Sequence, residues 1–151
     1  MELNGTRTIA ADRPTVWEHL NDPDTLRASI PGCEALEGSA EDGFEATVVQ
    51  KVGPVKARFR GRVTLSEVEP PESYRISGEG NGGVAGFAMG GARVHLREVE
   101  EGTELTYEAE AQLGGKLAQL GARVVGGVAR RLADQFFDNF RSHVERAGDG
   151  G

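Results

Sequence analysis

The stretch Val55–Leu65, which reads VKARFRGRVTL, decides the fold class. Its odd-numbered residues are apolar or glycine, whereas four of its five even-numbered residues are Lys or Arg. A period of two is typical of a β-strand with one buried face. The stretch therefore predicts a strand whose apolar side packs against a core and whose basic side faces solvent.

Alternation of the same kind extends on both sides of this strand, from Cys33 to Leu113. Clusters of Gly, Pro and acidic residues interrupt it, for example at Glu41–Gly43, Val52–Pro54 and Asn81–Gly83. Such clusters mark turns between antiparallel strands. Six strands are predicted in this region, and Glu2–Ile9 is expected to add a seventh.

The strand that begins near Phe87 contains a change of phase. Phe87 and Met89 alternate in one phase, the apolar residues of Ala92–Leu96 alternate in the other, and Gly90–Gly91 lies between them. A β-bulge at the two glycines would return both sets to the inner face and would bend the strand. We therefore expect a bulge here and a curved sheet.

Helical patterns flank the strands. Two short helices are predicted before residue 33, with Asp12 and Asp22 as N-caps and a proline in each first turn. Apolar residues then recur every three or four positions after residue 115, which predicts one long helix over residues 116–146. Three glycines interrupt this pattern: Gly121, Gly126 and Gly127. Each costs about 1 kcal/mol relative to Ala, so we expect either a bend or close approach of the backbone to a neighbour or ligand.

The element order predicts an α+β domain, a curved seven-stranded antiparallel sheet with two short helices and one long C-terminal helix. We expect a single ligand-binding domain over residues 1–147 and a flexible tail over residues 148–151. A chain of 151 residues can bury a core without a metal or a disulfide. Its one cysteine, Cys33, is expected to be a structural thiol.

Charge and composition exclude several classes of function. The chain has 17 basic and 24 acidic residues, a net charge of −7, which argues against binding to nucleic acid. Its three histidines are not spaced as metal ligands, and no known catalytic motif is present, so we predict neither a metal site nor catalytic residues. No apolar run has the length of a signal peptide or a membrane span. The expected location is the cytoplasm.

An apolar cavity between the long helix and the sheet is the remaining candidate site. Many inner positions are Gly or Ala, and aromatic residues make up only 6% of the chain, so few large side chains are available to fill the space. The alternative is that the small residues only let the helix approach the sheet closely, and composition does not decide between the two. The predicted ligand contacts are Phe59, Val63, Phe87, Met89, Tyr107, Leu117, Leu120, Gly121, Val124 and Val128.

Several short motifs together resemble a known family. They are Asp22-Pro23, Ile30-Pro31-Gly32-Cys33, Val52-Gly53-Pro54-Val55-Lys56, the run from Gly114 to Gly121, and Phe136-Phe137. In this combination the chain is similar, over about residues 1–145, to the family of the carbon monoxide dehydrogenase G-subunit. That family lies within the START-like, polyketide-cyclase-like (SRPBCC) superfamily, whose architecture is the helix-grip fold.

The resemblance implies a non-catalytic accessory protein that links a molybdenum hydroxylase, such as CO dehydrogenase, to the cytoplasmic membrane. It implies an apolar ligand, with a respiratory quinone or a lipid as the candidates, and no covalent cofactor. The implied partners are that ligand, the molybdenum hydroxylase and the inner face of the cell membrane, where the protein would be peripheral. The family does not specify which hydroxylase is served.

Two other functions remain open at this stage. The first is a polyketide cyclase or aromatase, for which only Tyr107 and Arg7 are placed by strand parity to act as acid or base inside the cavity. The second is an adaptor without a pocket, in which the basic long helix or the basic face of Lys56–Arg62 docks on an acidic partner.

Overall fold

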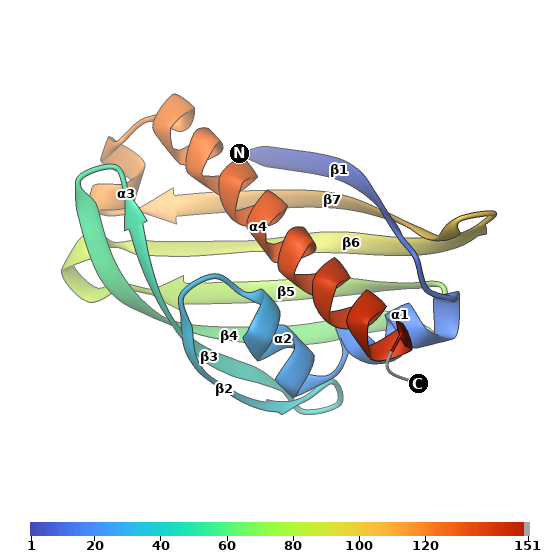
Figure 1. Ribbon diagram of the computed structural model, residues 1–151. Helices are drawn as coiled ribbons and strands as arrows, with labels where there is room; N and C mark the ends of the chain where they lie inside the picture. The colour runs from blue at the N-terminus through green and yellow to red at the C-terminus, as the bar shows by residue number, and fades with distance from the viewer. Residues whose placement is uncertain (150–151) are drawn as a thin grey trace.

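Seven strands form one antiparallel sheet in the computed structural model, which describes residues 1–149 (Figure 1). The strand order is β1-β7-β6-β5-β4-β3-β2, so that strands consecutive in the chain are neighbours from β2 to β7 and β1 pairs with β7. The predicted seven-stranded antiparallel sheet is therefore confirmed. The strands are β1 (Glu2–Ile9), β2 (Cys33–Ser39), β3 (Gly43–Val52), β4 (Val55–Glu69), β5 (Ser73–Asn81), β6 (Phe87–Val99) and β7 (Gly102–Gly114).

The helices gather on one face of this sheet, and the long helix α4 crosses it diagonally (Figure 1). They are α1 (Arg13–Leu20), α2 (Pro23–Ser29), the short 3-10 helix η1 (Gly83–Ala85), α3 (Lys116–Gln119) and α4 (Ala122–Asp149). The two short helices are thus as predicted, and a long C-terminal helix is present, although it begins at Ala122 and not at Lys116. Residues 150 and 151, the last two of the expected tail, lie outside the described residues.

Both predicted N-caps are present. The Asp12 carboxylate accepts a hydrogen bond from the Thr15 backbone N–H at 3.0 Å. The Asp22 carboxylate accepts two from Thr25, from its hydroxyl at 2.7 Å and its backbone N–H at 3.2 Å. The hydrogen bond from the Thr25 hydroxyl lowers the pKa of Asp22, so the cap of α2 stays ionised at neutral pH. These caps fix where each short helix begins, and hence which face α2 presents to the sheet.

The core lies where α1, the end of β1 and the C-terminal half of α4 meet the inner face of the sheet. Phe140 and Val144 of α4 are fully buried there, together with Ile9 of β1 and Val16 of α1. Leu96 of β6 is fully buried on the same face. The opposite half of the inner face is less covered by helices. The side chains of β4 that face inward there are therefore only half-buried.

The predicted β-bulge in β6 is wrong. The pairing of β6 with β5 and β7 runs without a register shift, so Phe87 and Met89 lie on the outer face, 46% and 45% exposed. A Cβ at Gly90 would lie 2.1 Å from the carbonyl oxygen of Glu110 on β7. The glycine is therefore required for close approach between strands, and no extra residue is inserted.

The single long helix predicted from residue 116 is interrupted. Gly121 has a positive φ of +88° and separates the single turn of α3 from α4. The interruption shifts the phase of the apolar stripe, so that Val125 is 8% exposed whereas Val124 is 41% exposed. The glycines were expected to mark either a bend or a close approach of the backbone. At Gly121 the change of direction takes the form of a break in the helix.

Candidate functional site

An apolar cavity of about 280 Å³ lies between the inner face of the sheet, α2 and α4. Only two of its lining side chains carry polar atoms, and both are tyrosines. The remaining side chains are aliphatic or phenyl groups. The lining residues are Leu20, Leu26, Ile30, Leu36, Phe44, Ala46, Val63, Leu65, Tyr74, Ile76, Ala92, Val94, Leu105, Tyr107, Phe136 and Phe137.

Small side chains on the sheet leave the space open. Ala46 of β3 and Ala92 of β6 belong to the floor of the cavity. Leu26 and Ile30, at the end of α2, form one wall, and Phe136–Phe137 of α4 forms the roof. A well-packed core leaves few voids larger than a water molecule. The space beneath the helix is therefore larger than ordinary packing defects.

The two tyrosines of the lining have different neighbours. The ring of Tyr74 meets the Trp17 ring of α1 edge-on, with 5.2 Å between centroids. Burial raises the pKa of the Tyr74 phenol, so the hydroxyl stays protonated and can donate a hydrogen bond. The ring of Tyr107 stacks on Phe137 at 5.3 Å, and a Cβ at Gly5 would lie 2.6 Å from its hydroxyl oxygen. Tyr107 therefore leans over β1.

Arg7 stands at the edge of the cavity on β1. Its cross-strand partner is Leu105, a lining residue, so the Arg7 side chain lies on the inner face. Its guanidinium lies 5.3 Å from the Phe137 ring centroid and 5.9 Å from that of Tyr107. It also forms an ion pair with Asp134 of α4 at 2.5 Å. A cation is thereby fixed beside the two rings that border the cavity, and its charge is balanced by a carboxylate.

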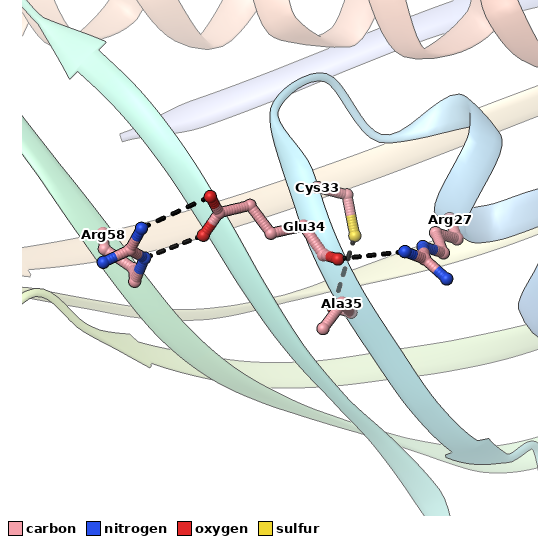
Figure 2. Close-up of polar contacts among 5 residues, drawn as sticks. All are labelled: Arg27, Cys33, Glu34, Ala35 and Arg58. Atoms are coloured by element: carbon pink, nitrogen blue, oxygen red, sulfur yellow. Dashed lines mark hydrogen bonds and ion pairs between the residues drawn. The ribbon is translucent and has the colours of Figure 1, made fainter.

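Polar contacts at the start of β2 hold α2 in place over the cavity (Figure 2). The Arg27 guanidinium of α2 donates to the backbone carbonyl of Glu34 at 3.1 Å, while the Glu34 carboxylate accepts two hydrogen bonds from Arg58 of β4, at 2.7 and 3.3 Å. The hydrogen bond from Arg58 lowers the pKa of Glu34, which keeps this link ionised. The network joins α2, β2 and β4 around the wall formed by Leu26.

Cys33 lies beside this network and is half-buried. Its thiol donates to the Ala35 carbonyl at 3.4 Å, and burial raises its pKa. A thiol with a raised pKa stays protonated and unreactive at neutral pH. Within residues 1–149, no group of three or more His, Cys, Asp or Glu side chains is arranged to bind a metal ion.

Two of the predicted ligand contacts, Val63 and Tyr107, line the cavity. Phe59 lies on the same face of β4 as Val63 but nearer the start of the strand, with its ring against Gly82. Phe87 and Met89 point away from the cavity because β6 has no bulge.

The predicted contacts from the C-terminal helix also lie elsewhere. Leu117 is buried in α3, while Leu120 and Val124 lie next to the turn at Gly53, where a Cβ would be 3.9 and 3.4 Å from their side chains. Gly121 forms the helix break, and Val128 is half-buried on α4 without lining the cavity. The helix meets the cavity more than two turns after Val128, at Phe136–Phe137.

Most residues that line the cavity were not among the predicted ligand contacts, for two reasons. Leu65, Ile76 and Leu105 share the strand phase that was predicted to face inward, so alternation could have found them. Leu26 and Ile30 come from α2, and the sequence carries no signal for which part of the sheet a short helix covers. Their identification required the tertiary structure.

The outer face of the sheet is charged and solvated, as predicted. Two open hollows on it are lined by polar residues such as Arg62 and Glu79. Neighbouring strands pair their charges across this face, as in Arg62 with Glu45 at 3.1 Å and Arg75 with Glu110 at 3.1 Å. Exposed pairs of this kind stabilise the sheet by about 0–1 kcal/mol each.

None of the helices within residues 1–149 combines the length and hydrophobicity needed to cross a bilayer.

Comparison with known proteins places this geometry in a family. Residues 5–145 match the family model of the carbon monoxide dehydrogenase G-subunit, CoxG. A crystal structure of a conserved protein from Geobacillus kaustophilus is 30% identical, with a TM-score of 0.90 and 97% of each chain covered. No curated protein matches the sequence.

More distant structures share the fold. An uncharacterized protein from Rhizobium leguminosarum is 15% identical with a TM-score of 0.75, covering 97% of this chain and 95% of that one. A protein from Thermus thermophilus is 17% identical with a TM-score of 0.72, covering 97% of this chain and 99% of that one. At these identities the likeness concerns the architecture alone, which is the expected helix-grip arrangement.

Proposed function

Because this chain belongs to the CoxG family, that of the carbon monoxide dehydrogenase G-subunit, we propose that it is a non-catalytic accessory protein of a molybdenum hydroxylase such as CO dehydrogenase. In this proposal it binds an apolar molecule beneath α4 and links the hydroxylase to the cytoplasmic membrane. The cavity of about 280 Å³, lined almost entirely by hydrocarbon, is the observation that carries the proposal. The protein would act in the cytoplasm, peripherally at the inner face of the membrane.

The size of the cavity favours a respiratory quinone over a two-chain lipid. Small-molecule pockets usually measure about 300–1,000 Å³, and this one lies just below that range. It has room for one ring and the beginning of a tail, whereas two acyl chains need more space. The protonated hydroxyl of Tyr74 is a donor suited to a quinone carbonyl, which accepts hydrogen bonds and cannot donate them.

A cyclase or aromatase is the second candidate from the sequence, and the lining disfavours it. Such chemistry needs a general acid or base within reach of the substrate. The sixteen lining residues include no Asp, Glu, His, Lys or Arg, which leaves the hydroxyls of Tyr74 and Tyr107 as the only groups of the lining that could transfer a proton. Arg7 at the edge is engaged with Asp134. A pocketless adaptor that docks through the basic face of β4 has only part of that face's charge to use, because Arg58 and Arg62 are paired with Glu34 and Glu45, whereas Lys56 and Arg60 form no ion pair within residues 1–149.

The single tryptophan provides a direct test of ligand binding. Trp17 contacts Tyr74, a lining residue, so a quinone in the cavity should quench its fluorescence. We expect saturable 1:1 quenching by a short-chain quinone, and little response to a short-chain phosphatidylcholine below its micelle concentration. Linear, unsaturable quenching by the quinone would contradict the proposal.

Variants on opposite faces of β6 provide the control. Ala92→Phe fills the cavity and should abolish saturable quenching, whereas Met89→Phe on the outer face should leave it unchanged. Ala46→Leu, a smaller intrusion from β3, serves as a second cavity variant if Ala92→Phe is poorly folded. Equal binding by the cavity and outer-face variants would place the ligand elsewhere.

A further inference from the structure

Three segments far apart in the sequence meet at one end of the molecule, beside α3 (Figure 1). They are residues 51–56, which form the β3–β4 turn, residues 81–87 around η1, and residues 112–124 around α3. A Cβ at Gly53 would lie 3.4 Å from Val124, and a Cβ at Gly115 would lie 2.8 Å from the Cα of Gly86. The three segments therefore form one continuous surface, which we call the loop end.

The loop end is strongly basic, although the protein as a whole is acidic. It contains all the lysines of the chain, Lys51, Lys56 and Lys116, as well as Arg123, and none of the 24 acidic residues. All four side chains are exposed. None of them forms an ion pair within the described residues, whereas arginines of the sheet, such as Arg93, are paired with a carboxylate. The positive charge of the loop end is thus uncompensated.

Apolar side chains project from the same surface. Val84 of η1 is 88% exposed, and Phe87 and Val124 are 46% and 41% exposed. Val84 lies in the stretch Gly82–Gly86, which carries no charge. An exposed apolar group flanked by unpaired cations is typical of proteins that bind at a membrane interface, where the apolar group enters the headgroup region and the cations meet lipid phosphates.

We propose that the loop end docks on a bilayer containing anionic lipids, with Val84 inserted and the lysines at the phosphate level. This inference rests on the proposed function, which brings the protein to the membrane, and it names the surface that makes the contact. All 24 acidic residues lie outside the loop end. The rest of the chain holds 13 basic residues (17 − 4) against these 24, a net charge of −11. An anionic bilayer therefore repels the rest of the molecule as a whole, which favours an orientation with the loop end toward the lipid.

Co-sedimentation with vesicles tests the docking surface. The wild-type protein should bind phosphatidylcholine vesicles that contain phosphatidylglycerol, and it should bind pure phosphatidylcholine vesicles much more weakly. Lys51→Gln combined with Lys56→Gln should weaken binding by about tenfold or more. The matched control, Arg131→Gln with Arg146→Gln, removes the same charge from exposed positions on α4 and should bind like the wild type. Equal loss in both double variants would overturn the proposal.

A second variant tests the apolar insertion apart from the positive charge. It also distinguishes membrane docking from ligand binding. Val84→Asp should abolish vesicle binding but leave the Trp17 titration with the soluble quinone unchanged. Failure of the wild type to bind vesicles while it binds the quinone would overturn the docking surface alone. Vesicle binding that is sensitive to Val84→Asp without any quinone binding would support the docking surface and contradict the proposed ligand.

Discussion

The Nη2 atom of Arg7 on β1 lies 2.5 Å from Oδ1 of Asp134 on α4. This ion pair is one of several polar contacts that hold α4 in place over the sheet. On the other side, the Asn139 amide donates to the Ser29 carbonyl of α2 at 3.1 Å. Between these two supports the helix covers the cavity with Phe136 and Phe137. The helix is thus anchored on both sides of a space that it does not fill.

We expect Arg7→Gln to lower the free energy of unfolding by about 1 kcal/mol. The substitution removes a partly exposed ion pair and the contact of the guanidinium with two aromatic rings, each worth about 0.5–1 kcal/mol. Urea denaturation measures the change. Arg131→Gln, an exposed position on α4 outside any ion pair within residues 1–149, is the control and should stay within about 0.5 kcal/mol of the wild type. Equal effects would mean that the Arg7 contacts contribute nothing.

The glycines of the C-terminal helices should respond with opposite signs. Gly121→Ala should destabilise the protein by about 1–3 kcal/mol, because Gly121 has a φ of +88° that Ala rarely adopts. Gly127→Ala should stabilise it by about 0.5–1 kcal/mol, because Gly127 lies inside α4 and a Cβ there would meet no other atom within 4 Å. Thermal unfolding of the two variants tests this pair. A stabilising Gly121→Ala would contradict the helix break.

Stability should fall in alkaline solution because of Tyr74. Burial raises the pKa of its phenol above the ordinary value of 10.0. As the pH rises above 10 the unfolded chain loses this proton while the folded protein keeps it, so folding becomes less favourable. One pH unit above 10 the loss amounts to about 1.4 kcal/mol. Tyr74→Phe should remove this part of the decline between about pH 8 and about pH 11, as measured by urea unfolding. An identical decline in the variant would show that Tyr74 ionises freely.

The two faces of β6 should differ in their tolerance of substitution. Phe87→Ser and Met89→Ser alter exposed side chains on the outer face and should change stability by less than about 0.5 kcal/mol. Leu96→Ala, on the same strand but fully buried, should cost about 2–5 kcal/mol. Denaturant midpoints of the three variants check the register. A large loss in Met89→Ser would support the bulge that the sequence had predicted.

The strands of the sheet were predictable because alternation is a local signal. In Val55–Leu65 each apolar residue is followed by a polar one, so the face of every side chain follows once one of them is assigned. The face on which Phe87 and Met89 lie was predicted wrongly, because two glycines separate these residues from the next apolar run. Glycine has no side chain to mark a face, so a bulge and a straight strand fit the same sequence.

The cavity was less predictable because its walls come from elements whose contacts are tertiary. The caps of α2 were read correctly from Asp22, yet nothing in the sequence indicates that Leu26 and Ile30 face β2 and α4. On α4 the break at Gly121 changed the phase of the stripe, and the contacts moved to Phe136–Phe137. The sequence offered an apolar cavity as one of two alternatives, and it indicated few of the residues that line the one observed.

Native mass spectrometry of the protein purified from its host tests the central claim most directly. The account predicts one apolar molecule bound per chain in the wild type, released by organic solvent, and absent from Ala92→Phe, whose added ring occupies the cavity. A wild-type protein that carries no such molecule, or an equal load in both proteins, would contradict the claim that the space beneath α4 is a binding site.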